Sequence, residues 1–296
     1  MFPFGLSGAL CVPLMKFRPL SLSLAATLMA GSAFAQSGYT IKLGYGSIDP
    51  RATSSDLKGT LPAYNAAAGG YLGNVAVSSG VSLEVQTQDT LMFSIERALN
   101  DNWAVELRLG YPPKHDVKLR VNNPQLQGDR AMLSDAGKAA VASAEAAYGP
   151  AGGDAAVAKV GQGVGAKLAA NNGLVVAGVR QWAPTLFLNY KFGDKTQALR
   201  PWVGVGINHT TFKSSTNAVG NELYHDGAVR VKLSDSTGLA FQTGVTYQFD
   251  QNWSLQASWM TAAVKHNLTT YTDHSSQKAT YRFHPSVFAA VVAYSF

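Results

Sequence analysis

The sequence has few cysteines, few charged residues and few long apolar runs. Cys11 is its only cysteine, so a disulfide within the chain and a site built from several thiolates are both excluded. Charged residues make up 14% of the chain, against about 25% in ordinary soluble domains. Beyond residue 35, no apolar run reaches the roughly 18 residues that a membrane-spanning helix needs. These shortages disfavour both a typical soluble domain and a bundle of membrane helices.

The chain is instead rich in glycine and tyrosine. It contains 29 glycines and 12 tyrosines, and its mean hydropathy is close to zero. This composition is typical of membrane proteins whose strands alternate apolar and polar residues. The net charge is +6, which is too small and too dispersed to indicate a nucleic-acid partner.

Residues 1–35 have the three parts of a secretory signal peptide. Lys16 and Arg18 form a basic start, a short apolar run follows, and Ala33-Phe34-Ala35 has the A-x-A form of a cleavage site. We predict cleavage before Gln36. The remaining residues 36–296 are expected to form a single outer-membrane barrel domain.

The start of the chain allows two further interpretations. Residues 1–14 precede a complete signal peptide, so Met15 is an alternative true start. A lipoprotein signal at Cys11 is disfavoured, because Leu10 stands where such signals need a small residue. Cleavage removes the cysteine and two basic residues, leaving a net charge of +4 (22 basic minus 18 acidic). A cysteine nucleophile is then excluded as well.

The rest of the chain alternates apolar and polar residues with a period of two. In one segment Trp253, Leu255, Ala257 and Trp259 alternate with serines and a glutamine, a pattern that indicates a strand and not an amphipathic helix. We predict eight such strands, at about 38–48, 82–97, 102–111, 183–192, 202–212, 239–249, 253–260 and 285–296.

The last strand carries its aromatic residues on one face, and the chain ends on phenylalanine. Tyr294 and Phe296 therefore resemble the C-terminal signal that the barrel assembly machinery of the outer membrane reads. Together with other aromatics at strand ends, they are expected to form an interfacial girdle.

The connections between the predicted strands alternate in length. Short turns fall at 100–102, 193–200 and 250–252. Long connections fall at about 49–81, 112–182, 213–237 and 266–281. Short periplasmic turns and long external loops are the pattern of outer-membrane barrels. We therefore predict an all-β protein, an eight-stranded antiparallel transmembrane β-barrel with both termini in the periplasm.

One loop is anomalous, because residues 122–179 are rich in alanine and glycine. Residues 134–148 read as a helix capped by Ser134 or Asp135 and ended by Gly149-Pro150, and 154–170 as a second helix. This insertion is either a pair of short helices over the barrel mouth or a flexible surface segment.

Several stretches of the predicted strands form recognisable motifs. The most specific is Arg200-Pro-Trp-Val-Gly-Val-Gly-Ile-Asn208, followed by Thr210-Thr-Phe212. The others are Asn102 to Leu107, Ala183 to Leu186, Tyr190 to Asp194, Asp250 to Trp253, and Pro285 to Phe296. Together these motifs resemble the outer membrane protein W (OmpW) family. The resemblance implies an eight-stranded barrel that binds or passes small hydrophobic molecules, and some relatives are associated with alkane or aromatic uptake. It does not extend over about 122–179.

The inward faces of the strands predict what fills the lumen. An eight-stranded barrel is about wide enough to be filled by side chains or to hold one small ligand. Five inward charges are expected to pair and close the floor, because unpaired buried charges are costly. They are Lys42, Glu96, Glu106, Arg108 and Lys191. The alternative is structural pairing without meaning for transport. Three inward residues, Phe187, Met260 and Val287, are apolar and predict an apolar upper lumen.

Prolines mark a candidate lateral gate. Pro112 and Pro113 end one predicted strand and Pro184 begins the next, and proline cannot donate to the hydrogen-bond ladder. A floor closed by charge leaves an apolar ligand an exit sideways into the bilayer, between these two strands. The alternative is that the prolines only terminate strands.

Three functions follow from these features. The first is passive passage or binding of small hydrophobic molecules, and the second is a structural barrel whose external loops bind a surface partner. The third, a lipid-modifying enzyme, is disfavoured because no H-E-x-x-H or G-x-S-x-G motif occurs and the six histidines lie mostly in loops or near strand ends. We therefore expect no catalytic residues, cofactor or metal, and expect as partners outer-membrane lipid, small hydrophobic solutes and the barrel assembly machinery.

Overall fold

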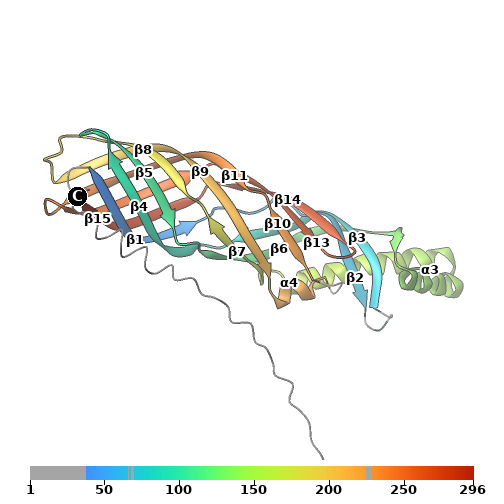
Figure 1. Cartoon of the computed structure of the whole chain (residues 1–296). Helices are drawn as coiled ribbons and strands as arrows, with labels where there is room; N and C mark the ends of the chain where they lie inside the picture. Colours follow the sequence, from blue (N-terminus) through green and yellow to red (C-terminus); the bar gives the residue numbers. More distant parts are fainter. Residues whose placement is uncertain (1–37, 66, 68–69, 225–227) are drawn as a thin grey trace, which may run out of the picture.

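A computed structural model describes residues 38–65, 67, 70–224 and 228–296. The predicted signal peptide, the cleavage site before Gln36, and His225 lie outside these residues. The described chain consists mainly of antiparallel strands, arranged as a barrel with a long extension at one end (Figure 1).

The barrel itself has eight strands, which confirms the predicted fold class. They are β1 (Tyr39–Asp49), β4 (Gln88–Ala98), β5 (Trp103–Gly110), β8 (Thr185–Lys191), β9 (Leu199–Thr216), β11 (Ser236–Gln248), β12 (Trp253–Ala262) and β15 (Ser286–Ser295). Each strand pairs with its neighbours, and β15 pairs with β1 to close the ring, with Leu43 opposite Val292.

The alternation in the sequence explains why these strands form a membrane barrel. Their outward residues are apolar and exposed, as at Leu43, Val205 and Phe288, whereas the inward residues are largely polar and buried. This is the reverse of a soluble sheet and matches a barrel whose outer face meets lipid. Aromatic rings gather at the end that carries the short turns, where Trp253 contacts Tyr294 edge-on at 4.9 Å.

Most of the segments expected to be long loops are strands. They are β2 (Lys58–Asn65), β3 (Gly70–Val85), β6 (Lys114–Leu133), β7 (Val175–Trp182), β10 (Arg230–Leu233), β13 (Val264–Tyr271) and β14 (Ser276–Phe283). They follow one another in the order β10-β13-β14-β2-β3-β6-β7 and join the end of β9. We call this group, with the last residues of β9, the extension. The expected strand at 82–97 is therefore two strands, since β3 ends at Val85 and β4 begins at Gln88.

The extension escaped sequence analysis because its outer face is charged. Along β6, His115, Val117 and Leu119 are buried, while Lys114 and Asp116, on either side of His115, are exposed. The period of two is present, but the outward residues no longer meet lipid. The membrane-strand pattern of apolar residues outside and polar residues inside therefore stops where the extension begins.

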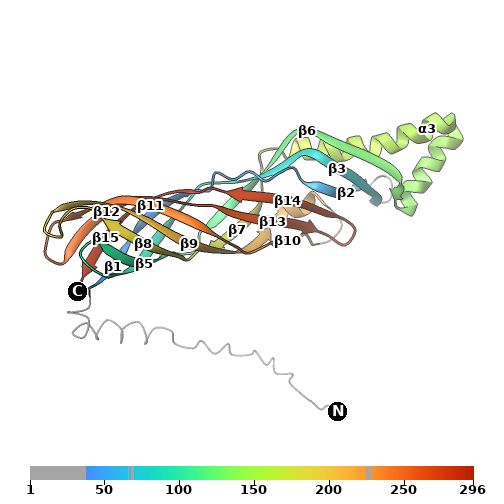
Figure 2. The same cartoon turned by 90° about the horizontal axis from the view of Figure 1, so that it is seen from above.

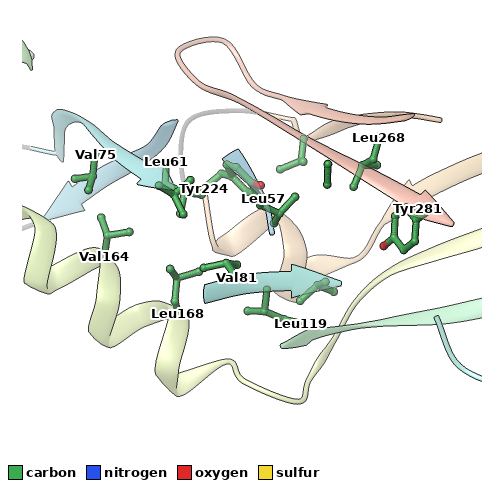
Figure 3. Packing of buried hydrophobic residues seen from close by; sticks show 14 of the residues in the cluster. Leu57, Leu61, Val75, Val81, Leu119, Val164, Leu168, Tyr224, Leu268 and Tyr281 are labelled. Atoms are coloured by element: carbon green, nitrogen blue, oxygen red, sulfur yellow. The ribbon is translucent and has the colours of Figure 1, made fainter. Parts of the chain in front are cut away.

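A hydrophobic core fills the extension (Figure 3). Its buried members come mainly from several strands and from the long helix, and they include Leu57, Leu61, Val75, Val81, Leu119, Val164, Leu168, Leu268 and Tyr281. The interior of the extension is therefore apolar, as in a soluble β-protein, whereas the interior of the barrel is largely polar.

Of the predicted insertion at about 122–179, residues 135–170 fold as α3 (Asp135–Ala170), which is two helices joined at a break. Its flanks are strands instead, since 122–133 belong to β6 and 175–179 to β7. Ser134 caps the first helix by accepting a hydrogen bond from Gly137 N, and Gly149 leaves the helical conformation with φ 73°. Pro150 follows directly, so the break falls at the predicted Gly149-Pro150, but the second helix begins at Pro150 and not at Asp154. On both sides of the break, Arg130 holds the helices together by bonding Glu145 and Asp154.

The second half of α3 runs along β3 and β6 on the outside of the extension (Figure 2), so the expected position over the barrel mouth is wrong. A short helix, α4 (Ala218–Glu222), packs on β7. In the part of the chain that the structure describes, neither helix is both long enough and apolar enough to cross a bilayer.

Leu168→Ala should detach α3 from the extension. Leu168 is one of the residues by which the helix packs into the core. Truncating a buried leucine to alanine typically lowers the stability of a protein by about 2–5 kcal/mol. We expect faster amide hydrogen exchange over 157–170 with an unchanged barrel. Leu174→Ala, at an exposed leucine close to the same helix, is the control and should leave exchange unaltered; equal protection in both variants would contradict the docking described.

Candidate functional site: the barrel lumen

A layer of charge crosses the lumen of the barrel. Lys42 Nζ lies 2.7 Å from Glu96 Oε2 and 3.2 Å from Glu106 Oε1. Arg108 Nε lies 3.6 Å from Glu106 Oε1, and Lys191 pairs with Glu96. These are the five residues predicted for the floor, and the structure brings all five together. We call them the charged layer.

Uncharged polar groups complete the hydrogen bonding of the two carboxylates. Ser94 Oγ donates to Glu106 Oε1 at 2.7 Å, while Asn189 Nδ2 and Gln242 Nε2 donate to Glu106 Oε2 at 2.8 and 3.0 Å. These three residues are not among the predicted site residues. Their inward position in the alternation was the available signal, but the pattern could not show which of many inward polar residues meet.

The charged layer leaves little room for water or ions. Glu106 and Gln242 are completely buried, and Lys42 is 1% exposed. Trp202 fills the remaining space, with its ring 5.8 Å from Lys42 Nζ. Three cations face two carboxylates, so the layer has a net charge of +1 within a closed network. An arrangement of this kind opposes passage of both ions and apolar solutes along the barrel axis.

A cavity of about 60 Å³ lies directly beyond the charged layer. Arg108 lines its lower side, and Met260 and Val287 line its walls. Phe187 is buried but does not reach this cavity: it lies level with Glu106 and packs over Gly206, where a side chain would collide with its ring. Of the three residues predicted for the apolar upper lumen, two therefore line the cavity. We call it the barrel cavity.

The barrel cavity reaches the wall at the prolines. The β5–β8 ladder ends at the pair of Arg108 with Thr185, and the β6–β7 ladder begins at the pair of Lys114 with Arg180. We call the stretch between these pairs, residues 109–113 and 181–184, the seam. Pro113 and Ala183 line the barrel cavity, whereas Pro112 and Pro184 lie in the seam outside its lining. One backbone hydrogen bond across the seam runs from Gln181 N to Pro113 O at 3.1 Å.

A second cavity, of about 40 Å³, lies inside the extension. Its walls are almost wholly apolar, and Phe283 and Gln181 line both cavities. Phe283 packs against the rings of Phe212 and Tyr281. We call this space the extension cavity, and Phe283 separates it from the barrel cavity.

Two buried histidines of the extension are held neutral. The Nδ1 atoms of His115 and His266 lie 2.9 and 2.7 Å from the backbone carbonyls of Gln86 and Ser234. A carbonyl only accepts, so each Nδ1 carries the proton. Burial lowers the pKa of both imidazoles below the usual 6.5. At neutral pH, therefore, neither histidine brings charge into the apolar lining, in contrast to the charged layer.

The remaining predicted site residues lie at the other end of the barrel. Tyr294 and Phe296 contact each other edge-on at 4.9 Å, and the amide of Phe296 donates to the carbonyl of Tyr39 at the point of closure. Within the described residues, no group of three or more histidine, cysteine or acidic side chains is placed to hold a metal ion.

Comparisons with known proteins agree on one family. A family model described as the OmpW family matches residues 150–296. Outer membrane protein W of Escherichia coli (strain K12) is 26% identical over 283 residues, which cover 95% of this chain and the whole of that protein. Outer membrane protein W of Vibrio cholerae is 33% identical over 114 residues, which are 38% of this chain and only about half (51%) of that protein.

A solved structure shares the fold. Outer membrane protein OprG from Pseudomonas aeruginosa has a TM-score of 0.59 and 19% sequence identity, covering 88% of this chain and 96% of that one. At this identity the likeness concerns the architecture of the barrel alone.

Lys42→Met should destabilise the barrel strongly. It leaves two buried carboxylates short of their shared cation, a loss that typically costs about 3–5 kcal/mol. Glu106→Gln in the same chain should recover part of the loss, because it removes one of those charges. Lys195→Met, at an exposed pair with Asp101, should change stability by less than about 1 kcal/mol. The measurement is denaturant unfolding in detergent micelles, and equal effects of the two lysine variants would refute the network.

Proposed function

Because this chain belongs to the OmpW family of outer-membrane β-barrel proteins, we propose that it is a passive conduit for small hydrophobic molecules. The observation that carries this proposal is the order of surfaces inside it. An apolar core and cavity in the extension lead to the barrel cavity, and the charged layer closes the way beyond it. An apolar solute would bind favourably in the extension and in the barrel cavity, but not against the charged layer.

We infer that the extension faces the outside of the cell and that both termini lie in the periplasm. The short turns and the C-terminus lie together at one end of the barrel, and the extension and α3 lie at the other (Figure 1). Short turns on the periplasmic side are the rule for such barrels. A solute would then enter through the extension.

The exit in this proposal is sideways, through the seam into the bilayer. Three features support it: the charged layer blocks the axis, the barrel cavity reaches Pro113 and Ala183, and the two ladders are interrupted there. Proline supplies no amide hydrogen to close the gap. Lateral release also needs no energy source, because the hydrocarbon of the membrane is the preferred medium for the solute.

A disulfide across the seam tests lateral release. Continuing the register beyond Arg108 and Thr185 places Gly110 opposite Ala183, and a side chain at Gly110 would make only ordinary contacts, the nearest at 3.5 Å. In the oxidised Gly110→Cys/Ala183→Cys variant we expect slow entry of a fluorescent apolar probe into outer-membrane vesicles, restored by reduction. The control variant, Ala257→Cys/Ala290→Cys, places a disulfide between β12 and β15, far from the seam, where the two residues already pair.

The possible results separate the parts of the proposal. Loss of probe entry in the seam lock alone supports lateral release. Equal entry with and without the seam lock would make lateral release wrong while leaving a conduit intact. Equal entry in vesicles with and without the protein would refute the conduit.

Passage further requires side chains to move, since both cavities are smaller than the roughly 150 Å³ that holds a benzene molecule. Phe283 separates them, so Phe283→Ala should join them and accelerate entry of the apolar probe several-fold. Phe288→Ala is the matched control, because Phe288 is 61% exposed on the lipid-facing side. Unaltered entry in Phe283→Ala would show that the solute does not pass between the cavities.

A second candidate is a surface-binding role for α3. This helix pair projects past the strands of the extension (Figure 2), and most of its residues are exposed. Deletion of 135–170 distinguishes the two functions: a conduit keeps its flux, whereas a binding barrel loses its partner. No catalytic role is proposed.

A further inference from the structure

A row of cations crosses three neighbouring strands of the extension. Lys114 of β6 is directly opposite Arg180 of β7, and Arg180 is directly opposite Lys213 of β9. All three are exposed, and their neighbours His115, Val179 and Phe212 line the extension cavity. The side chains of the row therefore point outward, away from the lumen.

A second pair of cations continues the pattern farther around the molecule. Lys265 of β13 is directly opposite Arg282 of β14, and both are exposed. The residues beside them, His266 and Phe283, are buried inside. We call the row and this pair together the basic belt.

The basic belt begins where the apolar outer face of the barrel ends. Trp182, 42% exposed, pairs with Thr211 two residues before the pair of Arg180 with Lys213. Two residues of a strand span about 7 Å. Exposed tryptophan marks the membrane interface in such proteins, so the row stands at the height of the lipid headgroups.

The charges of the belt have no partners within the described residues. Elsewhere exposed charges do pair: Arg230 lies 2.8 Å from Asp273 on the extension, and Lys195 lies 3.3 Å from Asp101 at the turn end. Like charges directly opposite each other on neighbouring strands repel and destabilise a sheet. Two nearby acidic residues, Asp116 and Asp235, are exposed but form no ion pair with the belt among those residues.

An apolar groove of about 800 Å³ lies on the lipid-facing side below the row. Leu186, Ile207 and Leu239 are among the residues that line it. On β9, Ile207 in the groove and Lys213 in the row are six residues apart, or about 20 Å along the strand. One leaflet consists of half of the roughly 30 Å hydrocarbon core and one headgroup region. The separation of Ile207 and Lys213 is close to the thickness of one such leaflet. The groove and the row therefore match the two ends of one lipid molecule.

We propose that the basic belt binds the phosphate groups of phosphorylated lipid in the outer leaflet, with an acyl chain of that lipid in the groove below. Phosphate neutralises the row, whose opposed cations otherwise repel one another, and lysine and arginine near an anionic lipid surface are each attracted to it. The proposed orientation decides only which leaflet supplies the lipid, and the conduit plays no part in the binding.

The test measures binding of bisphosphorylated lipid A to the purified full chain in zwitterionic detergent micelles by native mass spectrometry. Lys114→Gln/Arg180→Gln/Lys213→Gln should weaken binding by roughly tenfold or more. Lys138→Gln/Lys159→Gln/Lys195→Gln removes the same charge from exposed positions elsewhere and should bind like the unaltered protein. Lys114→Arg/Lys213→Arg keeps the charge of the row and should also retain binding.

Three results would overturn the proposal. One is equal weakening in the row variant and in its control, which would make the effect one of net charge. Another is equal binding of lipid A from which the phosphates have been removed. The last is full displacement of the lipid by inorganic phosphate at the same phosphate concentration, which would mark a site for small anions. Probe flux in vesicles is independent of these results, so failure here leaves the conduit untouched.

Discussion

Closure of the backbone hydrogen-bond ladder is the constraint on which the other features of this protein depend. Lipid offers no partner to an amide or carbonyl, so a sheet crosses a membrane only when its first and last strands pair. Here β15 pairs with β1 along the whole height of the barrel. Closing a ring of eight strands leaves a lumen that side chains fill. Inward charges such as Lys42 and Glu106 then lack water and must bond to one another.

The same closure decides where the strand pairing in the wall changes. Inside the membrane each strand has two partners. The charged layer ties four of the eight strands together from within, and Gln242 adds β11 by its hydrogen bond to Glu106. Where β5 and β8 give way to β6 and β7, the register changes and prolines remove donors. The barrel cavity lies between these two regions. A lumen filled by side chains and a change of pairing at one height in the wall both follow from a single ring that continues into a differently paired sheet.

The change of solvent at the end of the barrel explains the extension. Strand β9 passes through both parts, and its outward residues change from Val205 and Ile207 to Lys213. The inside changes in the opposite sense, from polar groups around Glu106 to an apolar core. One continuous set of strands therefore has two opposite patterns of burial, because lipid surrounds the first part and water the second. The basic belt lies at the boundary between these two media.

The sequence by itself determined the barrel, because alternation of apolar and polar residues is a local property that lipid enforces on every spanning strand. It also determined the helix pair, through Ser134 and Gly149-Pro150, and the five inward charges. Only the tertiary structure decided which groups meet: the bonds of Asn189 and Gln242 to Glu106, and the displacement of Phe187 from the barrel cavity, depend on register between strands far apart in the chain. The extension was also decided at that level, since the pairing of β14 with β2 and of β7 with β9 depends on register between segments far apart in the chain.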